Sequence, residues 1–293
     1  METKKEVWPV PFTPFHEDRS LDLDAVAPLM DFYIQAGVTG LFALGASGEV
    51  QFLNEEERLL MAGSVAKAVR GRCPVAVSGN FGSTLSEQID SLTRVRDCGV
   101  DIPVILLSSL PNSDSLAKQL LKIASLTEGS LGLYESFGKE HRVLSPEDTA
   151  AVAGSGRFVF MKETSIDLAL YIAKLRAAEG TPFKIHQANL ERLPASLDAG
   201  GHGFCGVAAN VWPVLIDRCC NDSDPRVRRE MHTTLMQYQQ VLRSHHYPAA
   251  GKYLLRLQGV PIQPTTRASR SEAFSEQDRA ALERFTDGLR AQT

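Results

Sequence analysis

Eight short runs of apolar residues, many of them β-branched or aromatic, recur along the chain. Each run is followed by a polar loop and then by a segment in which apolar residues return with the spacing of a helix. Strands that alternate with helices in this way are typical of βα units built on a parallel sheet. The runs occupy residues 6–12, 37–47, 74–80, 103–109, 130–136, 157–164, 182–188 and 201–208.

The segments between these runs carry signals for the starts of helices. Asn54 with Glu57, and Thr84 with Glu87, have the spacing of capping boxes, in which each residue hydrogen-bonds the backbone of the other. Residues 145–146, a serine followed by a proline, fit an N-cap with proline in the first turn. We therefore expect helices to begin directly after Asn54 and Thr84 and at residue 146.

Eight βα units over about 220 residues predict a (β/α)8 TIM barrel, a fold that usually takes about 250 residues. A doubly wound sheet is the alternative. After residue 224 the pattern is helical only. We therefore predict a barrel catalytic domain over residues 1–224 and a C-terminal helical extension over residues 225–293.

The composition is that of a globular protein, since 43% of the 293 residues are hydrophobic and 23% are charged. A net charge of -4 gives no electrostatic footprint for nucleic acid or for an anionic membrane, so we expect neither as a partner. No run reaches transmembrane length and the first residues lack a signal-peptide pattern, which favours the cytoplasm. The five cysteines form no CxxC pair, so neither a disulfide framework nor a zinc site is indicated.

Polar side chains that end the runs are the candidates for chemistry, because barrel enzymes place their active sites at the carboxyl ends of the strands. Lys162 follows the apolar residues 158–161, and Tyr134 ends the preceding run. Their strands are neighbours in a barrel, so the two side chains can approach each other. A neutral lysine amine can attack a carbonyl to form a Schiff base, and a tyrosine beside it can move protons. A solvated lysine beside a packed tyrosine is the alternative interpretation of these two residues.

A glycine-rich turn at residues 45–48 follows the second run. Its two glycines let the backbone come close to a ligand, and Ser47 adds a hydroxyl. Backbone amides together with a hydroxyl suit a carboxylate. The turn therefore predicts a carboxylate-binding loop, although turns of this composition also serve only as connections.

Five segments together resemble the dihydrodipicolinate synthase and N-acetylneuraminate lyase family. They are PVPFTPF, GASGE, LYES, MKETS and AGGHGFCGVAANV, and the resemblance extends from about residue 8 to beyond residue 260. It implies a (β/α)8 barrel with three C-terminal helices, commonly a homotetramer. It also implies a class I aldolase, lyase or dehydratase that acts on pyruvate or another 2-keto acid together with an aldehyde. We expect a homo-oligomer, a tetramer or a dimer, and no cofactor.

The resemblance also implies roles for individual residues. Lys162 matches the lysine that forms the Schiff base, and Tyr134 matches the tyrosine that acts on the substrate carboxylate and the transferred protons. Ser47 matches a hydroxyl residue of the carboxylate-binding loop, in which Ala46 and Gly48 are its neighbours. The other substrate-binding candidates are Thr164, Cys205, which matches a backbone carbonyl beside the site, and Glu191, which matches one of two sugar-binding carboxylates.

Four departures from the family pattern narrow the range of possible substrates. Ala46 stands where the family loop has a hydroxyl residue, and Ser108 or Ser109 stands where synthases have a tyrosine that reaches a neighbouring subunit. Both missing hydroxyls belong to one proton relay, so their absence argues against dihydrodipicolinate synthase activity. Lys139 aligns with the arginine that binds the second substrate of the synthase, and Leu190 replaces the other sugar-binding carboxylate, which argues against sialic acid.

Three other functions are compatible with the sequence. A 2-keto-acid dehydratase of the same family would use the same Schiff base, and a catalytically silent relative would only bind 2-keto acids. A metal-dependent barrel lyase is the third, because Glu135, Glu163 and His186 lie at strand ends and are ligand types for a divalent cation.

Overall fold

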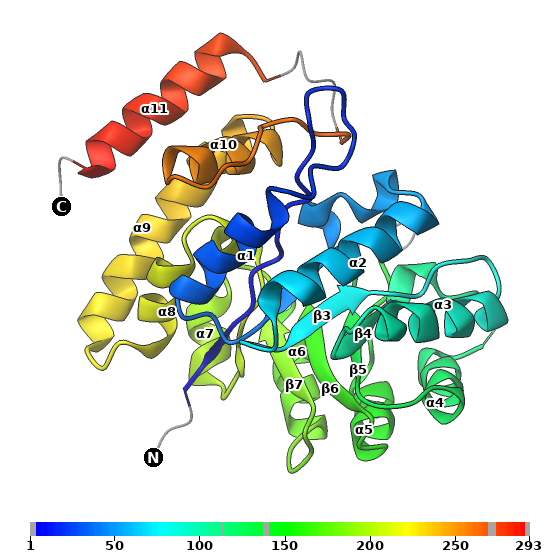
Figure 1. Ribbon diagram of the computed structural model, residues 1–293. Helices are drawn as coiled ribbons and strands as arrows, with labels where there is room; N and C mark the ends of the chain where they lie inside the picture. Colours follow the sequence, from blue (N-terminus) through cyan, green and yellow to red (C-terminus); the bar gives the residue numbers. More distant parts are fainter. Residues whose placement is uncertain (1–3, 113, 137–140, 269–273, 291–293) are drawn as a thin grey trace.

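The computed structural model describes residues 4–112, 114–136, 141–268 and 274–290. Lys139 lies outside these ranges. In Figure 1 the strands lie at the centre of the molecule and the helices surround them.

The strands form one parallel sheet in the order β1-β8-β7-β6-β5-β4-β3-β2. Two backbone hydrogen bonds join its ends, from Thr39 N to Val7 O at 3.0 Å and from Phe42 N to Pro9 O at 2.9 Å. The sheet is therefore closed into the predicted (β/α)8 barrel, and the doubly wound alternative is wrong because β1 lies next to β8. The strands are Glu6–Val7 (β1), Leu41–Ala43 (β2), Val75–Ser78 (β3), Ile102–Leu106 (β4), Leu131–Tyr134 (β5), Phe158–Glu163 (β6), Lys184–Gln187 (β7) and Gly203–Phe204 (β8).

Each strand is followed by a helix that covers the outside of the barrel, and the predicted starts are confirmed. Asn54 Oδ1 accepts from Glu57 N at 2.9 Å while Glu57 Oε2 accepts from Asn54 N at 3.0 Å. Thr84 and Glu87 form the second capping box. The helices of this part are Val26–Gln35 (α1), Glu55–Val69 (α2), Leu85–Asp97 (α3), Leu116–Leu126 (α4), Pro146–Gly154 (α5), Leu168–Ala177 (α6), Leu193–Asp198 (α7) and Pro213–Asn221 (α8), with short 3-10 turns at Ala46–Gly48, Val50–Phe52, Leu107–Ser109 and Val207–Asn210.

Alternation along the strands divides the buried side chains into two layers. Successive side chains of a strand point to opposite faces of the sheet, so every second residue points into the barrel and the others point toward the helices. Phe160 and Tyr134 belong to the inner cluster, whereas Met161 and Leu133 belong to the layer under the helices. The inner cluster consists of Trp8, Val10, Phe42, Ala76, Ile102, Val104, Tyr134, Phe160 and Cys205.

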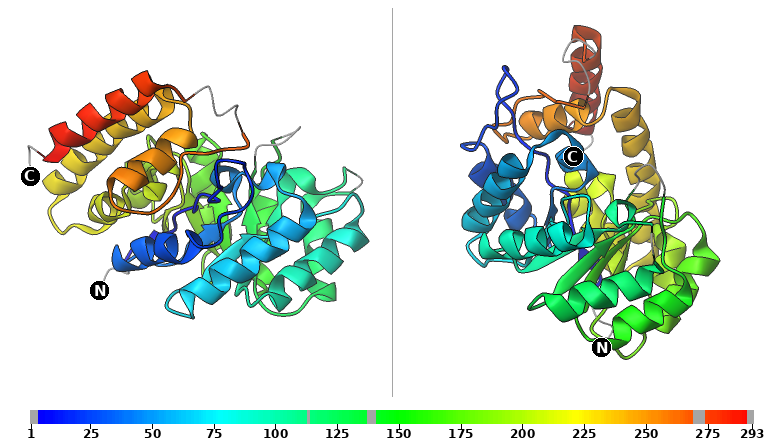
Figure 2. Two further views of the ribbon diagram at one scale, coloured as in Figure 1. Left: turned by 45° about the horizontal axis from the view of Figure 1, so that its top comes forward. Right: turned by 90° about the vertical axis from the view of Figure 1, so that its right-hand side faces the viewer.

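The C-terminal extension is helical, as predicted, and contains Pro225–Ser244 (α9), Ala249–Leu257 (α10) and Glu276–Arg290 (α11). Figure 2 shows α11 alongside α9 and α10, at one side of the barrel. Tyr238 of α9 and Phe285 of α11 pack edge to face, with ring centres 5.0 Å apart. Residues 260–268, between α10 and α11, are non-helical. The domain boundary at residue 224 itself stays a prediction.

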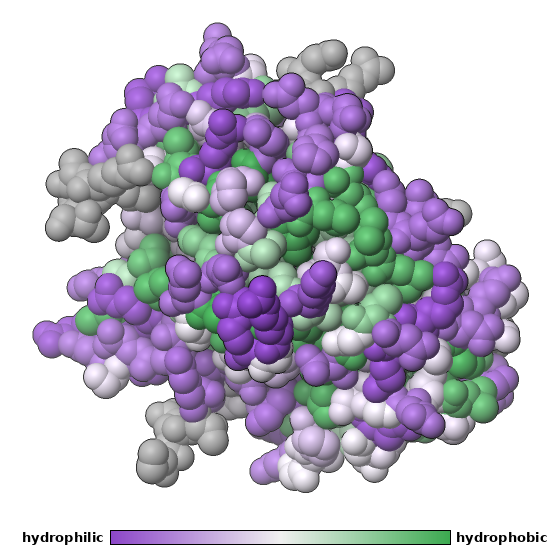
Figure 3. All heavy atoms as spheres, viewed as in Figure 1, coloured by the Kyte–Doolittle hydropathy of each residue, from purple (hydrophilic) through white to green (hydrophobic). Residues whose placement is uncertain are grey.

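Polar side chains dominate most of the surface in Figure 3, but apolar side chains gather in the middle of this face, over α2 and beside it. Phe52, in the 3-10 turn before α2, is 42% exposed, and Leu60, within α2, is 50% exposed. Within the described residues, no helix is long and apolar enough to cross a membrane.

Candidate active site

Lys162 and Tyr134 lie side by side in the mouth of the barrel. They are register partners on β6 and β5. Lys162 Nζ lies 4.8 Å from the centre of the Tyr134 ring and 5.8 Å from the centre of the Phe42 ring. Lys162 is only 6% exposed, and no carboxylate of the described residues pairs with its amine. The approach expected from the sequence is therefore present, and the amine faces aromatic rings rather than an anion.

The floor under this amine is aromatic, with one hydrogen-bonded carboxylate. Phe160 lies one inward position below Lys162, and the His186 ring stacks on it with centres 5.0 Å apart. His186 Nε2 lies 2.8 Å from Glu6 Oε2. Burial by itself would raise the pKa of Glu6, but hydrogen bonds from His186 and Trp8 outweigh it and lower that pKa to about 2. Glu6 is therefore held as a carboxylate at the bottom of the barrel, away from Lys162.

Cys205 and Thr164 border the same mouth. Burial raises the pKa of the Cys205 thiol to about 11, while the nearby charge of Lys162 acts in the opposite direction. The thiol is therefore neutral and no nucleophile at ordinary pH. Thr164 Oγ1 donates to Glu135 O at 2.5 Å and lies 2.8 Å from His141 Nε2, which makes the imidazole the donor of that second bond.

The turn after β2 brings Ser47 into the buried part of the site. Gly45 packs so closely on Val10 that a methyl group there would lie 2.7 Å from Val10 Cγ1. Gly48 O accepts a hydrogen bond from Thr13 Oγ1 at 2.5 Å. Ser47 and Gly48 are buried, whereas Ala46 is exposed. The two glycines therefore allow close packing of the turn on residues 10–13 of the same chain, and Ala46 lies on the solvent side of the turn. The approach of this turn to a ligand stays a prediction.

Glu49, the next residue, fixes this turn to the end of the chain. Lys252 Nζ donates to its Oε1 at 2.7 Å. Thr266 Oγ1 and the backbone amides of Arg267 and Ala268 donate to its Oε2 at 2.5, 2.7 and 2.9 Å. Four donors satisfy this buried carboxylate, which a buried charge requires.

Sequence reasoning missed two residues of the site, Tyr247 and Asn210. Tyr247 Oη donates to Ser47 Oγ at 2.5 Å, and Asn210 Nδ2 lies 3.0 Å from both hydroxyl oxygens. The nearby Tyr134 is among the groups that influence the pKa of Tyr247, which burial raises above its usual range. Tyr134 therefore lies near both Tyr247 and Lys162. No local signal marks Tyr247, since it follows two histidines at a helix end, 200 residues from Ser47.

The three side chains proposed as metal ligands do not share a site. Glu135 and Glu163 point outward from the barrel, where Lys174 Nζ of α6 lies 2.6 and 3.0 Å from their Oε1 atoms. His186 points inward and pairs with Glu6. Across the described ranges, no group of three or more acidic, histidine or cysteine residues could hold a metal ion. The metal alternative therefore fails for these residues, because neighbouring strand positions face opposite sides.

The remaining candidates lie at the rim. Ser108 Oγ and Ser136 Oγ are 2.6 Å apart. Glu191 is exposed, and its amide donates to Asn189 Oδ1 at 2.9 Å, whereas Leu190 is buried. The structure thus places Glu191 on the turn after β7 and shows no contact between it and Lys162 or Thr164.

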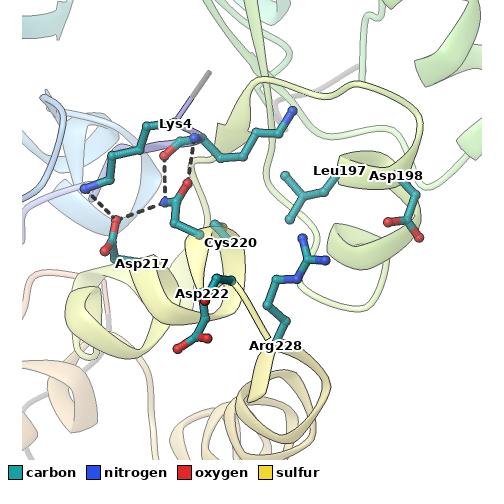
Figure 4. Close-up of a pocket in the computed structure, with 10 residues that line it drawn as sticks. Lys4, Leu197, Asp198, Asp217, Cys220, Asp222 and Arg228 are labelled. Atoms are coloured by element: carbon teal, nitrogen blue, oxygen red, sulfur yellow. Dashed lines mark hydrogen bonds and ion pairs between the residues drawn. The ribbon is translucent and has the colours of Figure 1, made fainter. Parts of the chain in front are cut away.

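A cavity of about 750 Å³ lies at the opposite end of the barrel. Figure 4 shows it between the segment before β1, the ends of α7 and α8, and the start of α9. Its charges are mixed, with Lys4 paired to Asp217 at 3.1 Å and Arg228 facing the same space. Barrel enzymes carry out their chemistry at the carboxyl ends of the strands, so this cavity is not the candidate active site.

Comparison with known proteins gives matches along almost the whole chain. The sequence model of the dihydrodipicolinate synthetase family matches residues 3–286. A protein of Laribacter hongkongensis named 4-hydroxy-tetrahydrodipicolinate synthase is 28% identical over 266 residues, which cover 88% of this chain and 91% of that protein.

Solved structures agree in fold. YagE, a prophage protein of the dihydrodipicolinic acid synthase family from E. coli K12 in complex with pyruvate, matches with a TM-score of 0.85 and 25% identity over 98% of both chains. N-acetylneuraminate lyase from Mycoplasma synoviae matches with a TM-score of 0.82 and 20% identity over 97% of both chains, a likeness in fold alone.

Proposed function

This chain belongs to the dihydrodipicolinate synthetase family, whose members are lyases, and from that premise we propose that it is a class I aldolase acting on pyruvate or a related 2-keto acid. Lys162 would form the Schiff base, and Tyr134 would move protons. YagE, at 25% identity, is described in complex with pyruvate, which supports the choice of ligand.

The reaction would proceed through an imine. The Lys162 amine attacks the keto carbon and a carbon–nitrogen bond forms. One amine hydrogen and one proton from solvent leave with the keto oxygen as water, which gives a protonated imine. The protonated imine then accepts the electron pair of the bond that breaks, so an aldehyde leaves and an enamine remains. Tyr134 would carry the proton that the leaving oxygen loses and the enamine carbon gains. Hydrolysis of the resulting imine returns the lysine and the 2-keto acid.

The observation that carries this proposal is the surroundings of Lys162. The amine is buried beside a tyrosine ring in the barrel mouth, and no carboxylate of the described residues holds it. It can attack a carbonyl without first breaking an ion pair. Ser47, in the glycine-rich turn, would bind the substrate carboxylate.

We further propose that the substrate is not that of dihydrodipicolinate synthase. Ala46 carries no hydroxyl and is exposed, and Ser108 Oγ contacts Ser136 Oγ of its own chain. Neither residue offers the relay hydroxyl that the family resemblance assigns to its position. Thr164 and Cys205 would then line the pocket for the remaining part of the substrate.

A dehydratase of the same family is the second candidate, and His141 favours it. Its Nε2 lies 2.8 Å from Thr164 Oγ1, at the edge of the mouth. Loss of a hydroxyl group as water requires a proton donor, and imidazole is a common one near neutral pH.

Imine trapping tests the proposal. Wild-type protein incubated with pyruvate and borohydride should gain the mass of one reduced adduct per chain, as measured by intact mass spectrometry. Lys162→Ala should gain none. Lys118→Ala is the matched control, because that side chain is 71% exposed and should leave the adduct unchanged.

Two results would contradict the proposal. One is an adduct that persists in Lys162→Ala. The other is the absence of any adduct with pyruvate and with longer 2-keto acids, which would favour a silent binding relative. Untreated wild-type enzyme can then be screened with aldehydes and with hydroxylated 2-keto acids. The products formed separate aldol cleavage from dehydration.

We also propose a homo-oligomer, a tetramer or a dimer. Exposed apolar side chains at Phe52 and Leu60 support this, because their surface is apolar enough to pack against another copy. Sedimentation equilibrium measures the mass in solution, and a monomer at micromolar concentration would contradict this proposal.

A further inference from the structure

Ser47, Asn210 and Tyr247 come from three distant parts of the chain and meet at one point. Ser47 lies in the turn after β2, Asn210 ends the 3-10 turn after β8, and Tyr247 lies between α9 and α10. Asn210 is fully buried and Ser47 is 4% exposed. Hydroxyl groups can donate and accept, so the direction of each bond in this cluster decides what Ser47 offers to a ligand.

A backbone amide fixes the first direction. Val10 N lies 2.6 Å from Asn210 Oδ1 and can only donate, so the oxygen of this side-chain amide must face Val10. The two hydrogens on Nδ2 then face Ser47 Oγ and Tyr247 Oη, each 3.0 Å away. Asn210 therefore donates to both hydroxyl oxygens and accepts from neither.

Tyr247 fixes the second direction. Burial raises the pKa of its phenol above the usual range, so the hydroxyl keeps its proton. Its oxygen already accepts from Asn210, and its hydrogen is directed at Ser47 Oγ, 2.5 Å away. Ser47 Oγ thus accepts from Asn210 and from Tyr247, which uses both of its lone pairs.

Only the hydrogen of the Ser47 hydroxyl is left for another partner. No hydrogen bond donated by Ser47 is found among the described residues. We infer that Tyr247 is a positioning residue which, together with Asn210, makes Ser47 an obligate donor and thereby favours a carboxylate, whose charged oxygens accept a hydrogen bond more strongly than the neutral oxygens of an ester. This inference rests on the proposed function, in which Ser47 binds the carboxylate of the 2-keto acid.

The helix that follows holds Tyr247 in place. The Phe12 and Tyr247 rings pack edge to face with centres 5.7 Å apart. Gly251 packs so tightly on Phe12 that a methyl group there would lie 2.4 Å from its Cζ. Lys252 pairs with Glu49, two residues beyond Ser47, at 2.7 Å. The Tyr247 hydroxyl therefore approaches Ser47 from a segment that is itself anchored to the same turn.

Replacement of Tyr247 by phenylalanine tests this inference, with pyruvate and methyl pyruvate as probes. The ester lacks the anionic acceptor, so the ratio of the two apparent affinities reads the preference for a carboxylate. In Tyr247→Phe the pyruvate concentration for half-maximal borohydride trapping should rise about fivefold to tenfold, the effect of one lost hydrogen bond. The value for methyl pyruvate and the maximal amount of adduct should change by less than about twofold.

Tyr33→Phe is the matched control. Tyr33 Oη donates to Asn210 O at 2.8 Å, so the same chemical change is made next to the cluster without contact to Ser47. This variant should keep the wild-type ratio of acid to ester. The inference would be overturned if Tyr247→Phe lost the same apparent affinity for pyruvate and for methyl pyruvate. It would also be overturned if Tyr33→Phe changed the ratio of acid to ester as much as Tyr247→Phe does.

Failure of the proposed function gives a different result. In that case wild-type protein forms no adduct with either probe. Saturation-transfer NMR with the same two ligands then measures the ratio of acid to ester without an imine. A ratio that is the same in wild type and Tyr247→Phe, or no binding of pyruvate at all, would still overturn the inference.

Discussion

Two neighbouring residues of β6 place buried ionisable side chains in opposite settings. Lys162 points into the barrel, where its amine faces the rings of Tyr134 and Phe42. Glu163 points outward, where it shares Lys174 with Glu135, and all three of these side chains are fully buried. The inner face thus holds a lysine without a carboxylate, and the outer face holds a lysine with two.

The difference distinguishes the lysine that we propose to be reactive from a structural one. An ion pair satisfies a buried amine, but it also holds the amine in its charged form and in one place. A lysine that must attack a carbonyl has to be free of such a partner. Burial alone therefore does not distinguish the two lysines, whereas the absence of a carboxylate partner does, and it supports the role proposed for Lys162.

The largest expected effect is on the inner face. Lys162→Ala should lower the rate of imine formation by about 10⁴-fold or more, because the nucleophile itself is removed. Its free energy of unfolding should fall by less than about 1 kcal/mol, since no ion pair is lost. Borohydride trapping and urea unfolding measure the two quantities. A large loss of stability with retained trapping would reverse the roles given to Lys162 and Lys174.

Tyr134→Phe should have the next largest effect. Turnover should fall by about 10² to 10⁴-fold, the usual contribution of a positioned acid or base. Trapping of the imine at long incubation should still reach one adduct per chain, because the nucleophile remains. If Lys162→Ala and Tyr134→Phe lose the same amount of trapped adduct at all incubation times, the tyrosine is needed to form the imine itself.

Lys174→Met tests the outer face. It leaves two glutamates buried without a cation, and loss of one partner of a buried pair costs about 3–5 kcal/mol of unfolding free energy. Urea unfolding measures this loss. The triple variant with Glu135→Gln and Glu163→Gln should recover most of it, because no buried charge is left unpaired. A wild-type free energy of unfolding in Lys174→Met would contradict the structural role.

The smallest effect is a pH dependence from Glu135. Burial raises the pKa of Glu135 to about 7, against the attraction of Lys174. The folded protein holds this proton more tightly than the unfolded chain, whose usual value is 4.5. The stabilisation is therefore complete below pH 4.5 and is lost as pH rises toward 7. Glu135→Gln stays neutral, so its free energy of unfolding relative to wild type should rise across this window.

The difference between variant and wild type is the quantity to measure, because His202 acts in the opposite direction. Burial lowers the pKa of His202 from 6.5 to about 4, so its contribution to stability is lost as pH falls through that range. Urea unfolding at a series of pH values measures the free energy of unfolding of both proteins. The contribution of His202 is the same in both and cancels in the difference. A difference that does not vary between pH 4.5 and 7 would contradict the shift of Glu135.

The parts of the fold that depend on local pattern could be predicted from the sequence. Each of the eight apolar runs overlaps a strand, and both capping boxes are present. Lys162 and Tyr134 could also be paired in advance, because parallel strands bring their carboxyl ends to one face of a barrel. These features depend on residues close in sequence or on the regular geometry of the fold.

The rest of the site depends on contacts between distant segments. Tyr247 reaches Ser47 across 200 residues, and Lys174 reaches Glu135 across 39. Nothing in the spacing of residues near Tyr247 or Lys174 indicates these partners. Strand alternation, however, already separates Lys162 from Glu163, and it accounts for the failure of the metal alternative.

The four donors on Glu49 also set an order of events during synthesis. A ribosome adds about 5–20 residues per second, so Ala268 is made at least about ten seconds after Glu49. Until then the turn that carries Ser47 lacks Lys252, Thr266 and the two backbone amides that hold it. The nascent barrel can pair its strands while still attached to the ribosome, but the Ser47 turn gains its full support only after residue 268 has been translated.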